Sequence, residues 1–112
     1  MKNTFLLLCI LGLFGCAQKG GLYSWGNYEA QTYNYFKGES PEAQVLALEK
    51  QMNDAKAKGQ NLPPGFHAHL ALLYEKTGKP NEMHAMFEAE KKLYPESSTY
   101  INNILNGFKD LK

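Results

Sequence analysis

The chain has 112 residues, of which 44% are hydrophobic and 12% are aromatic, and its formal net charge is +1. This length allows one domain at most. All twelve basic residues are lysines. Proteins that bind nucleic acids or phosphate groups rely on basic clusters and on the planar guanidinium group of arginine, so the composition disfavours both kinds of ligand.

The N-terminus has the features of a secretory signal. Lys2 precedes an apolar run at residues 5–14, and small residues follow at Gly15 and Ala17. The run is about half as long as the roughly 20 residues that a helix needs to cross a bilayer. We therefore interpret residues 1–15 as a signal that is removed, and not as a transmembrane span.

The signal is followed directly by Cys16, and Leu13-Phe14-Gly15-Cys16 resembles the bacterial lipobox, with leucine three residues before the cysteine and a small residue directly before it. The resemblance implies that Cys16 is alkylated with diacylglycerol, and that it becomes an acylated N-terminus after cleavage. Two or three acyl chains anchor a protein stably in a membrane. Alanine at position 17 implies, by the enteric sorting pattern, the outer membrane, with the domain facing the periplasm. The alternative is an ordinary secreted protein cleaved near Ala17.

Lipidation would leave the rest of the chain without a thiol. Cys9 lies in the signal and Cys16 carries the lipid, so residues 17–112 contain no cysteine for a disulfide, a redox pair or a nucleophile. Removal of Lys2 leaves eleven lysines to balance eleven acidic residues. We expect residues 16–22 to form a tether and residues 23–112 to form a domain that is stabilised by packing.

The first predicted helix lies in an aromatic stretch. Five residues recur three and four apart and so share one helical face: Trp25, Tyr28, Thr32, Tyr35 and Phe36. This face is either buried against the next helix or exposed to bind a partner protein. Tyr23 and Tyr33 lie off the face, and we expect their rings to be exposed. The candidate partner-binding residues, rich in the ring types that anchor interfaces, are Tyr23, Trp25, Tyr28, Tyr33, Tyr35 and Phe36.

A second helix is predicted from Pro41 to about Lys58. Ser40 suits the N-cap, and proline suits the first helical position. Its apolar stripe, against which the aromatic face would be buried, consists of Val45, Leu48, Met52 and Ala55.

Three further helices follow, separated by clear breaks. Pro63-Pro64-Gly65 precedes the third, the turn Lys79-Pro80-Asn81 precedes the fourth, and Pro95 ends the fourth before a last helix capped by Ser97 or Ser98. Their apolar stripes are Phe66, Leu70, Leu73 and Tyr74; Met83, Met86, Phe87 and Leu93; and Ile101, Ile104, Leu105 and Phe108. No alternation typical of a strand occurs, so we predict an all-α domain of about five helices.

The stretch from Pro64 to Pro95 resembles a tetratricopeptide repeat. The residues that match the family's classes are Leu70, Ala71, Tyr74, Gly78, Phe87 and Pro95, whereas His67 and Met83 replace the usual tryptophan and alanine. The resemblance implies antiparallel helical hairpins, with a looser repeat before this one and a C-terminal capping helix after it. Counted from Gly38, it places the aromatic face in the concave groove that binds peptides. A shift of one residue makes that face core.

No pattern typical of an active site occurs. There is no Gly-rich phosphate loop, no serine nucleophile elbow and no zinc pattern. His67 and His69 are two residues apart and cannot chelate one metal ion from a regular helix. We predict no enzymatic activity, no cofactor and no metal site. The least favoured alternative is a metal-dependent enzyme that uses one of these histidines with His84 and Glu88.

A second resemblance covers residues 16–110. Cys16, LYSWGNYEAQTYNYF at 22–36 and ALLYEKTGKPNEMHAMFEAEKKLYPES at 71–97 resemble a family of short bacterial lipoproteins known only as a domain of unknown function. Members often accompany a lipoprotein related to the curli secretion channel. The resemblance implies a membrane-anchored accessory module that binds envelope proteins, among them such a channel-like lipoprotein, and helps to assemble or stabilise their complex. The alternative is a structural lipoprotein that binds peptidoglycan or glycan through exposed rings.

Overall fold

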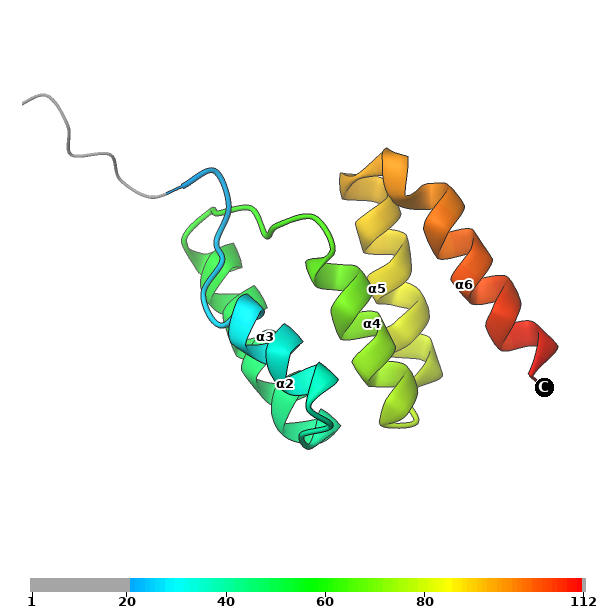
Figure 1. Cartoon of the computed structure of the whole chain (residues 1–112). Helices are drawn as coiled ribbons and strands as arrows, with labels where there is room; N and C mark the ends of the chain where they lie inside the picture. Colours follow the sequence, from blue (N-terminus) through cyan, green and yellow to red (C-terminus); the bar gives the residue numbers. More distant parts are fainter. Residues whose placement is uncertain (1–20, 112) are drawn as a thin grey trace, which may run out of the picture.

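The computed structural model describes residues 21–111 (Figure 1). This part is all-α, as predicted, with five α-helices and no strand. The elements are α2 (Tyr28–Phe36), α3 (Pro41–Ala57), α4 (Phe66–Lys76), α5 (Pro80–Leu93), the short 3-10 helix η2 (Pro95–Ser97) and α6 (Ser98–Asp110). The predicted signal at residues 1–15, Cys16 and most of the predicted tether lie outside the described residues.

The chain reverses direction at each connection between helices (Figure 1). Across the molecule, the pair α2 and α3 is followed by the pair α4 and α5, and then by α6. The ends of α3 and α5 therefore lie at the same end of the molecule as the beginnings of α2, α4 and α6. None of the helices among residues 21–111 is both long and apolar enough to cross a membrane.

The predicted helix boundaries are confirmed where proline, glycine and serine mark them. At the start of α3, Ser40 Oγ accepts a hydrogen bond from Ala43 N at 3.4 Å, and Pro41 occupies the first turn. The helix ends at Ala57, one residue before the predicted end. For α6 the sequence offered Ser97 or Ser98 as the cap. Ser97 occupies the N-cap position, but its side chain accepts no capping hydrogen bond, and its hydroxyl donates to Tyr94 O at 2.7 Å.

The core runs through α3, α4, α5 and the start of α6. Its buried apolar residues are Val45, Leu48, Ala55, Leu62, Phe66, Leu70, Ala71, Leu73, Tyr74, Met83, Phe87 and Ile101. The whole predicted stripe of α4 is buried. Leu93, predicted to belong to the stripe of α5, is 53% exposed, because it is the last residue of α5, where η2 turns the chain away.

A buried carboxylate joins α5 to the beginning of α4. Gly65, the N-cap of α4, has no side chain to accept from the free N–H groups of the first turn. Glu90, which is 2% exposed, supplies the acceptors: its carboxylate accepts from Gly65 N at 2.5 Å and from His67 N at 3.2 Å. The helix N-terminus is thus capped by a residue of the next helix, whose negative charge also complements the helix dipole.

Candidate interaction surfaces

The aromatic stretch begins before its helix. We predicted Trp25 to share a helical face with Tyr28, but α2 begins only at Tyr28, so this prediction is wrong for Trp25. The physical cause lies between them: Gly26 has a φ of +42°, which is outside the right-handed helical region. Trp25 belongs instead to an extended segment that leads into the helix.

A buried glutamine holds this segment against α3. Gln51 Nε2 donates to the carbonyl oxygens of Ser24 at 3.0 Å and Trp25 at 2.7 Å, and Gln51 Oε1 accepts from Asn27 N at 3.1 Å. Ser24 N also donates to Asn61 O at 2.7 Å, in the loop between α3 and α4. These four bonds, which we call the Gln51 clamp, fix the backbone of residues 24–27.

Two of the candidate rings pack inward. Tyr28 lies 5.4 Å from Phe66 and 6.0 Å from His69, between ring centroids, and Tyr35 lies 5.1 Å from His69. Both tyrosines are half-buried against the core, and burial raises the pKa of the Tyr28 hydroxyl. Their rings therefore connect α2 to α4, whereas the sequence left open burial against α3 or exposure to a partner protein.

Two other rings face solvent. Phe36 is 81% exposed and Tyr33 is 64% exposed, both on α2, and we call them the outer aromatic surface. The Lys37 ammonium lies 5.2 Å from the centre of the Tyr33 ring, a cation–π contact. Since neither ring packs in the core, α2 keeps both large apolar side chains in water.

The remaining two rings lie at the segment before α2. Trp25 is 46% exposed. Tyr23, which we expected to be exposed, is half-buried, because its ring packs edge-on against Trp25 at 6.4 Å and against Tyr94 at 6.3 Å. The six candidate residues thus do not form one face. Two pack inward, two form the outer aromatic surface, and two lie in the segment before α2, where Tyr23 contacts Tyr94 and Trp25 lies 6.1 Å from Tyr28.

The histidines do not come together. His67 and His69 are both buried on α4, but His67 Nδ1 lies 3.7 Å from the Glu90 carboxylate, whereas His69 faces Tyr28 and Tyr35. Burial lowers the pKa of His69, and a backbone hydrogen bond at Gln31 only partly opposes this. Among residues 21–111, no three His, Cys, Asp or Glu side chains are placed to hold a metal ion.

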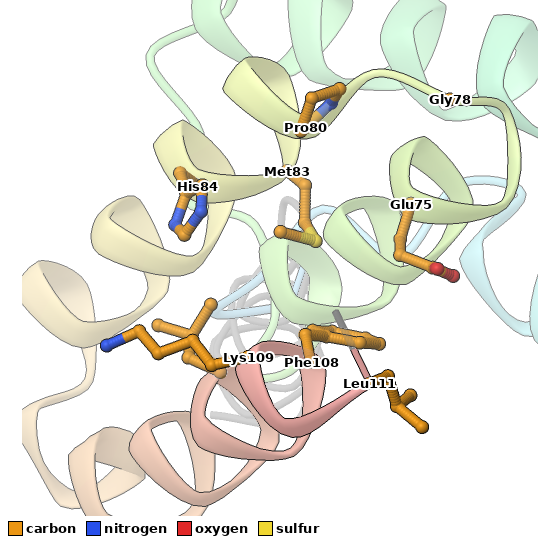
Figure 2. A pocket seen from close by; sticks show the side chains of 9 residues that line it. Glu75, Gly78, Pro80, Met83, His84, Phe108, Lys109 and Leu111 are labelled. Atoms are coloured by element: carbon orange, nitrogen blue, oxygen red, sulfur yellow. The ribbon is translucent and has the colours of Figure 1, made fainter.

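An apolar groove that was not predicted from the sequence lies between α6 and the start of α5 (Figure 2). Its volume is about 430 Å³. The side chains of Met83 and Phe108 face each other across it, with His84 and Glu75 at its rim (Figure 2). The apolar stripe predicted for α6 could have indicated this groove. Ile101 is fully buried, but Leu105 and Phe108 further along the helix are only partly buried, and they line the groove.

A comparison with protein families gives one match. The model of a family described as a domain of unknown function, DUF4810, matches residues 22–104. The match contains the segment of the Gln51 clamp, the outer aromatic surface and the core helices, and it ends within α6. No curated protein and no solved structure matches the chain.

Proposed function

Because the chain belongs to this DUF4810 family of unknown function, we propose a function from its surfaces: it is a membrane-anchored accessory module that binds a protein of the cell envelope. The module would help to assemble or stabilise an envelope or secretion complex. A lipoprotein related to the curli secretion channel is one such partner, implied by the resemblance of residues 16–110 to short bacterial lipoproteins.

The observation that carries the proposal is the outer aromatic surface. Tyr33 and Phe36 leave 64% and 81% of their area exposed on a helix that has no fully buried residue. Aromatic side chains supply much of the binding energy of protein interfaces, because they bury a large area with few rotatable bonds. Exposing two of them on one short helix lowers solubility without contributing to the core, which favours a role in binding.

The lipid anchor supplies the second part of the mechanism. Acylation of Cys16, implied by the lipobox resemblance, would confine the domain to the membrane surface. Confinement raises the effective concentration of the domain near any membrane partner, so a modest interface is sufficient for association.

The tetratricopeptide resemblance implies how the helices of this module are arranged. α2 with α3, and α4 with α5, would be two degenerate helical repeats, and α6 would cap them. In that family the first helices of the repeats line the peptide-binding side. The outer aromatic surface belongs to such a first helix, α2. This supports a protein or peptide as the partner.

Photocrosslinking in cells tests the proposal. A photoreactive phenylalanine analogue replaces Phe36 in the full chain, and its matched control replaces Leu46, which is 68% exposed on α3. We expect a protein adduct from position 36, identified by mass spectrometry, that Tyr33→Ala weakens. No adduct is expected from position 46. Equal labelling at both positions, or none, would refute the proposed role of this surface.

The same experiment separates the alternatives. Recovery of cell-wall fragments on the position 36 probe, without protein, would support a structural lipoprotein that binds glycan. If a probe in place of Phe108 gives an adduct and the probe at position 36 does not, the partner binds in the groove of Figure 2. For a metal-dependent enzyme, metal analysis of the purified protein, together with the effect of a chelator on its stability, provides the test.

A further inference from the structure

We propose that the end of the domain from which the N-terminal segment leaves is a docking surface for the phospholipid bilayer. We call it the tail end: it contains residues 22–25, the end of α3, the end of α5 and the beginning of α6 (Figure 1). This inference rests on the proposed lipid anchor at Cys16, and it adds the orientation in which the anchored domain meets the membrane.

The exit point of the N-terminal segment is fixed by contacts. Tyr23 forms an isolated bridge with Asn61, and Ser24 N donates to Asn61 O at 2.7 Å. The Tyr23 ring contacts Tyr94, whose hydroxyl donates to Leu62 O at 2.6 Å. The segment is therefore held between the α3–α4 loop and the end of α5, and it cannot swing to another side of the domain.

The chain between the anchor and this exit is short. Five residues lie between Cys16 and Leu22, so six Cα–Cα steps join the two. Fully extended, six steps reach roughly 20 Å. A lipid on Cys16 would thus keep Leu22 within that distance of the acyl chains, and the tail end is the part of the domain nearest the bilayer.

The tail end carries apolar side chains that contribute little to the core. Leu22 is 77% exposed, Trp25 46%, Leu93 53% and Tyr100 61%. Leu93 is the last residue of α5, and Tyr100 lies in the first turn of α6. Tryptophan and tyrosine are enriched where a membrane meets water, because their rings are apolar and also carry a polar group.

The charges of the tail end suit phospholipid head groups. Lys56, Lys58 and Lys92 are exposed near the ends of α3 and α5 and make no ion pair with any residue of 21–111. Two nearby carboxylates are already paired, Asp54 with Lys50 at 2.7 Å and Glu88 with Lys91 at 2.6 Å. Glu96 in η2 is exposed and makes no ion pair among residues 21–111, so it offsets one of the three lysines. The remaining charge of the tail end is positive, and anionic lipid phosphates attract it.

The opposite end differs in charge. It combines carboxylates and lysines in similar numbers: Glu39, Glu42, Glu82 and Asp110 with Lys37, Lys79 and Lys109. With the tail end on the bilayer, this opposite end and Phe36, at the last turn of α2, would point away from the membrane.

The only tryptophan of the chain makes the orientation measurable. The lipidated full-length product is incorporated into vesicles of phosphatidylethanolamine and phosphatidylglycerol, some with a nitroxide near the head group. We expect Trp25 fluorescence to shift to the blue on incorporation and to be quenched by the nitroxide lipid. The matched control is the double variant Trp25→Phe/Phe36→Trp, which moves the probe to the far end of α2, and we expect it to show acrylamide quenching but little lipid quenching.

A charge variant tests the lysines. Each lysine near an anionic membrane surface shifts the equilibrium between docked and undocked domain about fivefold. Lys58→Gln/Lys92→Gln should therefore lower the ratio of docked to undocked domain about 25-fold and reduce lipid quenching of Trp25. If the protein carries lipid by mass and floats with the vesicles, but lipid quenches Trp25 no more than it quenches the control, the docking surface is refuted while the anchor stands. If the protein carries no lipid, both proposals fail.

Discussion

Replacing Glu90 with glutamine should lower the free energy of unfolding by about 2 kcal/mol, because a charge-assisted hydrogen bond to one buried N–H is lost while the other is kept. Glutamine has the same shape but only one acceptor oxygen. Its amide nitrogen would face either Gly65 N or His67 N, which the carboxylate now serves at 2.5 and 3.2 Å. Glu90→Ala removes both acceptors and leaves a cavity, and should cost about 3–5 kcal/mol.

Urea unfolding followed by far-UV circular dichroism measures this change. For a domain of this size, a loss of about 2 kcal/mol also lowers the Tm by about 8–16 °C. Glu88→Gln is the matched control, since Glu88 lies on the same helix but is exposed and paired only with Lys91 at 2.6 Å. An exposed pair of this kind contributes at most about 1 kcal/mol.

The pH dependence of stability gives a second test of the Glu90 cap. Burial alone would raise the pKa of Glu90, but hydrogen bonds from His67 and from the backbone at Gly65 outweigh it and lower the pKa below the ordinary 4.5. The stabilisation is therefore complete above pH 4.5 and is lost as the pH falls through the lowered value. Glu90→Gln should remove this loss. A Glu90→Gln protein as stable as the parent, with the same acid dependence, would refute the capping role.

Three further predictions concern other positions. Burial lowers the pKa of His69 below 6.5, so the unfolded chain takes up a proton before the folded one as the pH falls below 6.5. The free energy of unfolding should therefore decrease below pH 6.5. His69→Phe should abolish this decrease in urea titrations at several pH values. Gly26→Ala should destabilise the domain by about 1–3 kcal/mol in the same assay, since the added Cβ would lie 2.7 Å from Gln51 Cδ. Gly38→Ala should show only the smaller backbone cost of a positive φ, because its added Cβ would meet no atom within 4 Å. Gln51→Leu should release the clamped segment and make Trp25 more accessible to acrylamide, and unchanged quenching would show that Gln51 does not hold it.

The sequence predicts the helices of this domain well where local chemistry decides them. Pro41 and Ser40 mark the start of α3, and the apolar spacing of α4 identifies Phe66, Leu70 and Leu73, all fully buried. These features depend on residues at most a few positions apart. Propensity and periodicity capture them for that reason.

Long-range polar contacts were not predictable in the same way. Gln51 and Glu90 look like ordinary solvent-facing residues of amphipathic helices, yet they are 7% and 2% exposed. Their partners lie 23 to 27 residues away in the chain, at Ser24, Trp25, Gly65 and His67. Spacing along one helix carries no information about such partners. The same limit explains Trp25, whose three-residue distance from Tyr28 fitted a helix that begins only at Tyr28.

The Gln51 clamp also determines how the domain would respond to mechanical load. A pull on an anchored N-terminus reaches the Ser24–Asn61 bond and the Gln51 bonds before it reaches α2. These bonds pass the force to α3 and to the loop after it, which are tied to the core through Leu48, Ala55 and Leu62. α2, whose Tyr28 and Tyr35 are half-buried against the core, follows the clamped residues in the chain and lies outside this force path. The outer aromatic surface would therefore keep its shape while the tether is under tension.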